Sequence, residues 1–167
     1  ASVTVCQISV GFFALDRLQL GWPQAAQAAG IALTTVGVAL MLSQILLRRL
    51  EWPPLKMIRV GASISALGFA TAALAGSAEW LWASFFIAAA GMGFVFPAFS
   101  ALAANAMHAS EQGATAGSIG AAQGMGAVIG PLAGTLVYAL DPRLPFVAVA
   151  VLLLLAGLWP MPAEPRR

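Results

Sequence analysis

Long stretches without a charged side chain are the feature that most limits how this chain can fold. Asp, Glu, Lys and Arg are absent from residues 18–47, 60–78, 80–110, 112–140 and 144–163. A helix needs about 20 apolar residues to cross a hydrocarbon core about 30 Å thick. Each stretch is therefore about one membrane crossing long, with room for a connecting loop in the longer ones.

The composition excludes a soluble domain, a disordered chain and a nucleic-acid-binding protein. Only 8% of its 167 residues are charged and 60% are hydrophobic, whereas soluble domains average about 25% charged and about 45–50% apolar residues. Disordered chains are poor in apolar residues, and the scattered cations do not form a nucleic-acid surface. The one cysteine, Cys6, allows no internal disulfide and matches no metal-ligand spacing.

We therefore expect an all-α, polytopic membrane helical bundle with five full transmembrane helices and one truncated helix, all in a single transmembrane domain over residues 1–167. Continuous apolar runs exclude the alternating strands of a membrane barrel. Short connections make consecutive helices antiparallel. The expected helices cover residues 1–15 (partial), 25–47, 57–76, 80–104, 113–138 and 145–161. Because the chain opens with Ala1 inside an apolar stretch, we also expect a fragment of a longer protein.

The distribution of cations predicts the orientation of the bundle. If the crossings alternate, six cations share one side of the membrane: Arg48, Arg49, Lys56, Arg59, Arg166 and Arg167. Only Arg17 and Arg143 fall on the other side. Cytoplasmic loops carry the excess of Lys and Arg, so we expect a basic cytoplasmic loop around residues 48–59 and a cytoplasmic C-terminus. The expected location is a plasma membrane, such as the bacterial inner membrane.

Glycines and other small residues recur at helical spacing in two of the expected helices. One face of the 57–76 helix carries Gly61, Ser65, Gly68, Ala72 and Gly76, and seven glycines lie between residues 113 and 134. Membrane helices pack closely through small residues, because lipid provides no hydrophobic drive for association. The seams have two interpretations: plain helix packing, or surfaces that slide or bend during a conformational cycle.

Two proline motifs favour the second interpretation. Proline removes a backbone donor and clashes with the preceding turn, so a helix kinks there, and a glycine one turn earlier makes room for the bend. We predict that these residues form helix-kink and packing motifs: Gly91, Gly93 and Pro97 in one helix, and Gly126, Gly130, Pro131 and Gly134 in the next.

These motifs resemble those of the major facilitator superfamily. The stretch Gly126-x-x-x-Gly130-Pro131-x-x-Gly134 is similar to the G-x-x-x-G-P-x-x-G signature of its drug:proton antiporters, in the form that recurs in the eleventh helix. Gly91-x-Gly93-x-x-x-Pro97 resembles the family's tenth helix. The basic turn from Arg48 to Gly61 resembles the loop between helices eight and nine, although it lacks the fuller Gly-Asp pattern of that loop.

The resemblance implies that the chain is the C-terminal six-helix half of such a transporter. Its partners would then be the lipid bilayer, the missing N-terminal six-helix half and a small-molecule substrate bound between the halves near the midplane. Nucleic acid is not an expected partner, and no cofactor or metal is implied.

Polar residues at membrane depth are functional candidates because burying them in lipid is costly. Gln123 and Gln7 lie within expected helices, and Phe94 beside Pro97 could line an aromatic pocket; we take these three as candidate residues of a substrate pathway. The alternatives are a hydrogen bond between helices for each glutamine and a lipid-facing side chain for Phe94. Gln44 is expected at the membrane interface, and His108 in a solvated loop.

The function that fits these patterns best is part of a secondary active transporter that moves small, fairly apolar molecules, in the direction of efflux, by alternating access. The alternative is a non-transporting helical membrane scaffold or an oligomeric pore subunit. An enzyme is not expected, because the sequence has no Ser–His pair at membrane depth, no paired carboxylates and no phosphate-binding glycine loop. Apart from Arg59 in the first turn of one expected helix, no full charge lies within an expected span. The groups that couple transport to ions would therefore belong to the missing half.

Overall fold

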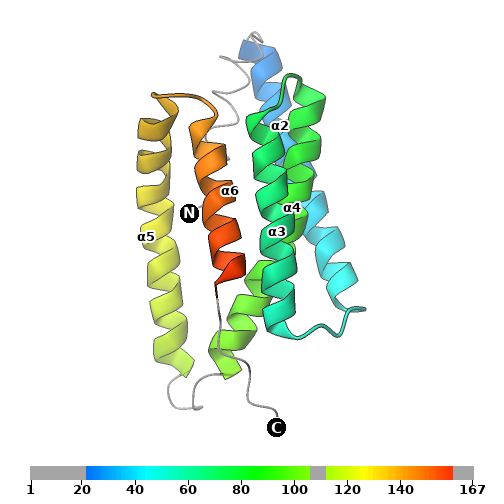
Figure 1. Ribbon diagram of the computed structural model, residues 1–167, viewed down its shortest axis with the longest axis vertical. Helices are drawn as coiled ribbons and strands as arrows, with labels where there is room; N and C mark the ends of the chain where they lie inside the picture. Colours follow the sequence, from blue (N-terminus) through cyan, green and yellow to red (C-terminus); the bar gives the residue numbers. More distant parts are fainter. Residues whose placement is uncertain (1–21, 106–111, 160–167) are drawn as a thin grey trace.

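The computed structural model describes residues 22–105 and 112–159, which form helices and no strands. Figure 1 shows these helices as a bundle whose long axes run roughly together. The expected helix over residues 1–15, together with Gln7, lies outside the described residues. The helices are α2 (Trp22–Leu47), α3 (Pro54–Ala73), α4 (Ala78–Asn105), α5 (Gln112–Tyr138) and α6 (Leu144–Leu158).

Proline and short polar turns separate the helices. Pro53 is the N-cap of α3, and Pro54 is its first helical residue, where the missing N–H is not needed. Between α5 and α6, the Asp141 carboxylate accepts a hydrogen bond from the backbone N–H of Arg143 at 2.8 Å. This is the turn chemistry that the Asp-Pro-Arg sequence predicts. The helix ends differ from the expected ranges by a turn or less.

The five helices do not pack equally. The main contacts join α3 to α4, α2 to α4, and α3 to α6, so that α3 and α4 form the centre of the bundle. Helix α5 touches α6 and α4 at only a few places, and Figure 1 shows it on the outer side of α6. The packing order is therefore α2, α4, α3, α6, with α5 at the edge.

Three of the helices are long and apolar enough to cross a membrane: the spans are Ala26–Leu47, Ala78–Ala103 and Ala116–Tyr138. The expectation of five full spans is confirmed for these three only. Helix α3, with 20 residues, is long enough to cross a membrane, but its first two turns carry the cations Lys56 and Arg59. Helix α6 is apolar but has 15 residues, which is shorter than the about 20 that a crossing needs.

The largest core cluster lies between α3, α4 and α6. Phe85 of α4 is at its centre, because its ring meets two other rings edge-on. The ring centroids of Phe85 and Phe69 of α3 are 6.4 Å apart, and those of Phe85 and Phe146 of α6 are 6.1 Å apart. Leu81 and Phe146 are fully buried in the same cluster. Edge-to-face pairs of this kind stabilise a core beyond the area that they bury, so three helices are joined through one aromatic ring.

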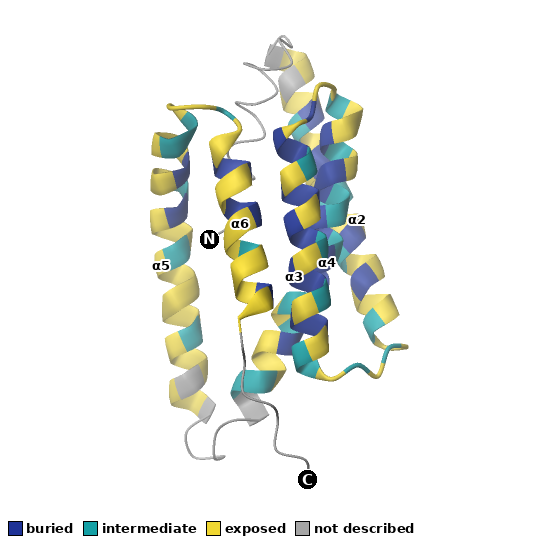
Figure 2. Cartoon of the chain, viewed as in Figure 1, coloured by how far each residue is buried: buried dark blue, intermediate teal, exposed yellow. Residues whose placement is uncertain are grey.

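The outer helices leave most of their surface uncovered. Figure 2 shows exposed residues along most of α5 and on the outer side of α2. Only 17% of the α2 span and 11% of the α5 span are buried, compared with 44% of the α4 span. Because the uncovered side chains are largely apolar, these faces suit lipid or other membrane helices rather than water.

The two ends of the bundle differ in charge. Figure 1 shows the α2–α3 connection, with Arg48 and Arg49, at the same end as the last turn of α6. The α5–α6 turn with Arg143 lies at the opposite end. This relative placement is the one that alternating crossings require. Arg17, Arg166, Arg167 and His108 lie outside the described residues.

Candidate functional site

Helices α3 and α4 cross at a point where both have glycine. A Cβ added to Gly61 would lie 2.6 Å from the carbonyl oxygen of Gly91, and one added to Gly91 would overlap the Gly61 carbonyl and the backbone nitrogen of Ser65. The two backbones are therefore in direct contact, as small residues allow in membrane helices. The predicted packing face of this helix is confirmed at Gly61, Ser65, Gly68 and Ala72, which are all buried.

The same crossing is held by a buried hydrogen bond. The Ser65 hydroxyl donates to the carbonyl oxygen of Ala88 at 2.7 Å and has no exposed surface. One turn along α3, Gly68 lies against the backbone of Ala88. Gly76, by contrast, lies beyond the end of α3 with nothing within 4 Å of an added Cβ. The seam thus runs from Gly61 to Ala72 and ends with the helix.

Gly93 serves the other side of α4. A Cβ at Gly93 would lie 2.5 Å from the Cβ of Ser43 in α2. The Ser43 hydroxyl shares its one proton between the Ala39 carbonyl of its own helix at 2.8 Å and the Ala90 carbonyl of α4 at 3.0 Å. Successive residues of a helix are about 100° apart, so Gly91 and Gly93 face opposite neighbours. The predicted Gly91-x-Gly93 motif therefore packs α4 between α3 and α2 at one level.

Pro97 follows this two-sided contact by one turn. It lies inside α4, and Figure 1 shows the last turns of α4 leaving the line of its first turns. Proline has no N–H, so the Gly93 carbonyl, four residues earlier, loses its helical donor. The Gln44 side-chain nitrogen of α2 lies 3.3 Å from that carbonyl oxygen and donates to it. Gln44 was expected at the membrane interface, near the end of α2; the structure adds a contact with the neighbouring helix α4.

Phe94 is a packed side chain. It is 6% exposed and belongs to a cluster with Met57, Ile58 and Ala98 at the α3–α4 contact. Its ring stacks on Trp52 at a centroid distance of 6.4 Å. Phe96 and Phe99, which also flank Pro97, are about half exposed. The sequence did not distinguish these three rings, and only the structure places Phe94 inside.

The basic turn meets the Phe94 cluster through Trp52. The ammonium group of Lys56 lies 4.4 Å from the centre of the Trp52 ring, a distance typical of a cation–π contact. Arg48, Arg49 and Arg59 are exposed around it. Trp52 thus connects the cationic surface of the turn to the interior of the α3–α4 contact.

The proline motif of α5 lies in the least covered helix. Gly130 and Gly134 are buried, Gly126 and Pro131 are half-buried, and Gln123 is exposed. Four glycines earlier in the helix have nothing within 4 Å of an added Cβ: Gly113, Gly117, Gly120 and Gly124. Within the described part of the chain, the predicted α5 seam is therefore packed only around Gly130 and Gly134.

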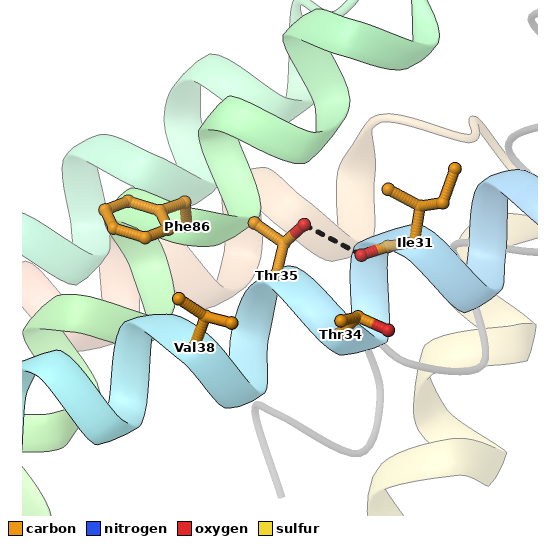
Figure 3. A pocket seen from close by; sticks show the side chains of 5 residues that line it. All are labelled: Ile31, Thr34, Thr35, Val38 and Phe86. Atoms are coloured by element: carbon orange, nitrogen blue, oxygen red, sulfur yellow. Dashed lines mark hydrogen bonds between the residues drawn. The ribbon is translucent and has the colours of Figure 1, made fainter.

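A shallow groove of about 260 Å³ runs between α2 and α4. Figure 3 shows the side chains that line it: Ile31, Thr34, Thr35, Val38 and Phe86. The Thr35 hydroxyl donates to the Ile31 carbonyl at 2.7 Å, and the Thr34 hydroxyl to the Gly30 carbonyl at 2.9 Å. Both hydroxyls are thus satisfied within α2, which leaves an apolar groove wall.

The described residues hold no group of three or more His, Cys, Asp or Glu side chains that could bind a metal ion. The arrangement is instead one of apolar helices, with the central pair α3 and α4 closely packed and the charged residues within helices confined to the first two turns of this pair. No curated protein and no solved structure matches the chain significantly. The family profile of the Major Facilitator Superfamily, a family of transporters, matches residues 3–167. The chain therefore belongs to the major facilitator superfamily.

Proposed function

We propose that the chain is the C-terminal six-helix half of a major facilitator transporter that exports small, fairly apolar molecules by alternating access. Family membership makes transport the function of the protein and disfavours a scaffold or a simple pore. The proposal adds that the chain is the C-terminal half, that transport is in the direction of export, and that the substrates are small and fairly apolar. Its partner would be an N-terminal six-helix half, and substrate would lie between the two.

The observation that carries the substrate class is the apolar character of the helix walls. Helices α2, α5 and α6 contain no Asp, Glu, Lys or Arg, and α4 has only Glu79 in its first turn. The groove between α2 and α4 presents only apolar groups and two hydroxyls that are already bonded within their own helix. A substrate that carries many polar groups would lose its water without gaining partners at such walls.

The same walls bear on energy coupling. A proton-coupled antiporter needs a titratable group at membrane depth. The three apolar spans carry titratable groups only at their ends, Glu79 in α4 and Tyr138 in α5. We therefore assign the coupling group to the N-terminal half. This chain would supply apolar contact surface and conformational change.

Three residues remain candidates for the substrate pathway. Gln123 is exposed on α5 and has no helix packed over it in the described part of the chain, so it is free to meet a molecule held between the two halves. Gln7 lies outside the described residues. Phe94 is buried against α3 and Trp52, so it could reach substrate only in a state in which that contact opens.

The bent helices suit a rocking mechanism. Helix α4 is bent at Pro97, meets the backbone of α3 at Gly91 and meets the Ser43 side chain of α2 at Gly93. Helix α5 carries the second proline and has little packing around its first half. Seams of small residues present smooth surfaces along which helices can shift. We propose that α4 moves with α2 and α3 while α5 changes its contacts between states.

The orientation follows from the same charge pattern. The basic turn and the end of α6 share one end of the bundle, and Lys and Arg are enriched on the cytoplasmic side. We place this end in the cytoplasm, with the protein in the plasma membrane, as in the inner membrane of a bacterium.

Accumulation of a fluorescent lipophilic cation in cells tests the proposal. Cells that produce the intact protein should accumulate less dye than cells with the empty vector, and a proton uncoupler should remove the difference. Gly130→Leu, which fills the buried position of the α5 motif, provides the matched inactive control at equal protein level. Equal accumulation in producing and empty cells across several apolar dyes would contradict export.

A further inference from the structure

The Gln44 amide lies at the one carbonyl of α4 that proline deprives of its helical donor. In an α-helix the carbonyl of residue i accepts a hydrogen bond from the N–H of residue i+4, so the donor to the Gly93 carbonyl would be the N–H of residue 97. That residue is Pro97 and has no N–H. Nε2 of Gln44 lies 3.3 Å from the Gly93 oxygen, across the boundary between α2 and α4.

We infer that Gln44 is a positioning residue that replaces the hydrogen bond removed by Pro97 and so fixes the bend of α4 to α2. The inference concerns the bend itself and holds whatever the protein transports. An unsatisfied carbonyl at membrane depth is costly because no water is present to bond it. A donor from a neighbouring helix removes that penalty only while the two helices keep their relative position.

Two neighbouring residues make the contact possible. Gly93 has no side chain, and a Cβ there would lie 2.5 Å from the Cβ of Ser43; only glycine lets α2 approach this closely. The Ser43 hydroxyl lies 2.8 Å from the Ala39 carbonyl oxygen of its own helix and 3.0 Å from the Ala90 carbonyl oxygen, two turns before Pro97, so its one proton is shared between the two acceptors. Helix α2 is thus bonded to α4 at successive turns, by Ser43 and by Gln44.

The two bonds differ in kind. The Ala90 carbonyl also has the N–H of Phe94 as its helical donor, so the Ser43 bond is an addition. The Gly93 carbonyl has lost its helical donor, so the Gln44 bond is a replacement. The amide orientation follows from the same fact, because a carbonyl acceptor requires the NH2 group of the glutamine and not its oxygen.

A double-mutant cycle separates this role from ordinary packing. Thermal unfolding of the intact protein in detergent is compared for Gln44→Met, Pro97→Ala and the double variant, with Ser43→Ala as the matched control. Methionine keeps the length of the side chain and removes the donor. Alanine at position 97 restores the backbone N–H, so Gly93 no longer needs Gln44.

We expect Gln44→Met to lower the melting temperature by about 2 °C, because it leaves the Gly93 carbonyl without a donor. In the Pro97→Ala background the same substitution should change it by less than about 1 °C. The loss caused by Ser43→Ala should be equal in both backgrounds. The inference would be overturned if Gln44→Met lowered the melting temperature equally in both backgrounds, or did not lower it in the protein that keeps Pro97.

A distance measurement tests the bend directly and does not depend on the Pro97→Ala variant folding. One spin label is placed at exposed Ser100, which follows Pro97 in α4, and the other at exposed Glu51 in the α2–α3 connection at the same end of the bundle, so that a change of the bend moves one label relative to the other. Gln44→Met should broaden or shift this distance, whereas Ser43→Ala should leave it unchanged. An unaltered distance in Gln44→Met would show that Gln44 does not position the bend.

Discussion

Gly61 and Gly91 face each other across α3 and α4 so closely that a Cβ on Gly61 would lie 2.6 Å from the Gly91 carbonyl oxygen. The two helices meet there through their backbones, with Ser65 bonded to Ala88 one turn away. This crossing determines how close the two central helices lie, and therefore how the aromatic cluster around Phe85 is packed.

The first prediction concerns this crossing. Gly91→Ala should destabilise the protein by about 1–3 kcal/mol, because the added methyl group meets backbone atoms that cannot rotate away. Gly37→Ala in α2 is the matched control, since nothing lies within 4 Å of its added Cβ; it should be neutral or slightly stabilising. Thermal unfolding in detergent measures both. Equal losses in the two variants would contradict the backbone contact.

The second prediction concerns the contact between α2 and α4 at the other end of the bundle. The Trp82 indole N–H donates to the Ala28 carbonyl at 3.0 Å. Trp82→Phe should therefore reduce stability by about 0.6 kcal/mol, the mean for hydrogen bonds between membrane helices, in addition to any loss of ring area. Trp80→Phe is its control because Trp80 is 52% exposed. A larger loss of stability from Trp80→Phe than from Trp82→Phe would contradict a stabilising role of the Trp82–Ala28 hydrogen bond.

The third prediction concerns the α5 proline motif. Gly130 is buried beside Pro131, and Gly130→Leu should impair transport while insertion into the membrane remains normal. Val128→Leu is the control, because Val128 is 75% exposed two residues away. Transport rate and the amount of protein in the membrane are both measured. Normal transport by Gly130→Leu would mean that this seam does not take part in the mechanism.

The fourth prediction concerns orientation. Replacing Arg48, Arg49, Lys56 and Arg59 with glutamine removes the cationic turn, so a reporter fused to the C-terminus should lose part of its cytoplasmic signal. The single variant Arg143→Gln at the opposite end should keep or raise it. A C-terminal reporter that is already extracytoplasmic in the unchanged protein would refute the assigned orientation.

Much of the helix arrangement could be predicted because lipid imposes a strong rule on charge. Residues such as Arg48, Lys56 and Asp141 interrupt the apolar runs, and the helices end near them. The small-residue face of α3 could also be predicted, because Gly61, Ser65 and Gly68 recur at helical spacing, which indicates close helix packing in a membrane.

The sequence could not show which side of α4 faces which neighbour. Its residues are apolar all around, so Phe94, Phe96 and Phe99 look equivalent until packing buries Phe94 and leaves the other two half exposed. The partner of Gln44 could not be predicted for a related reason. Its partner, Gly93, is 49 residues away, and the lone glutamine becomes informative only when α2 lies beside the bend at Pro97.

Efflux from proteoliposomes is the most direct test of the central claim that this chain belongs to an exporter of small apolar molecules. The intact protein is reconstituted, the vesicles are loaded with a fluorescent lipophilic cation, and a pH gradient is imposed. We predict that, when the pH gradient is imposed, the dye leaves vesicles with the unchanged protein faster than protein-free vesicles, and that Gly130→Leu removes this difference. Dye movement at the rate of protein-free vesicles, with a correctly inserted protein, would contradict the account.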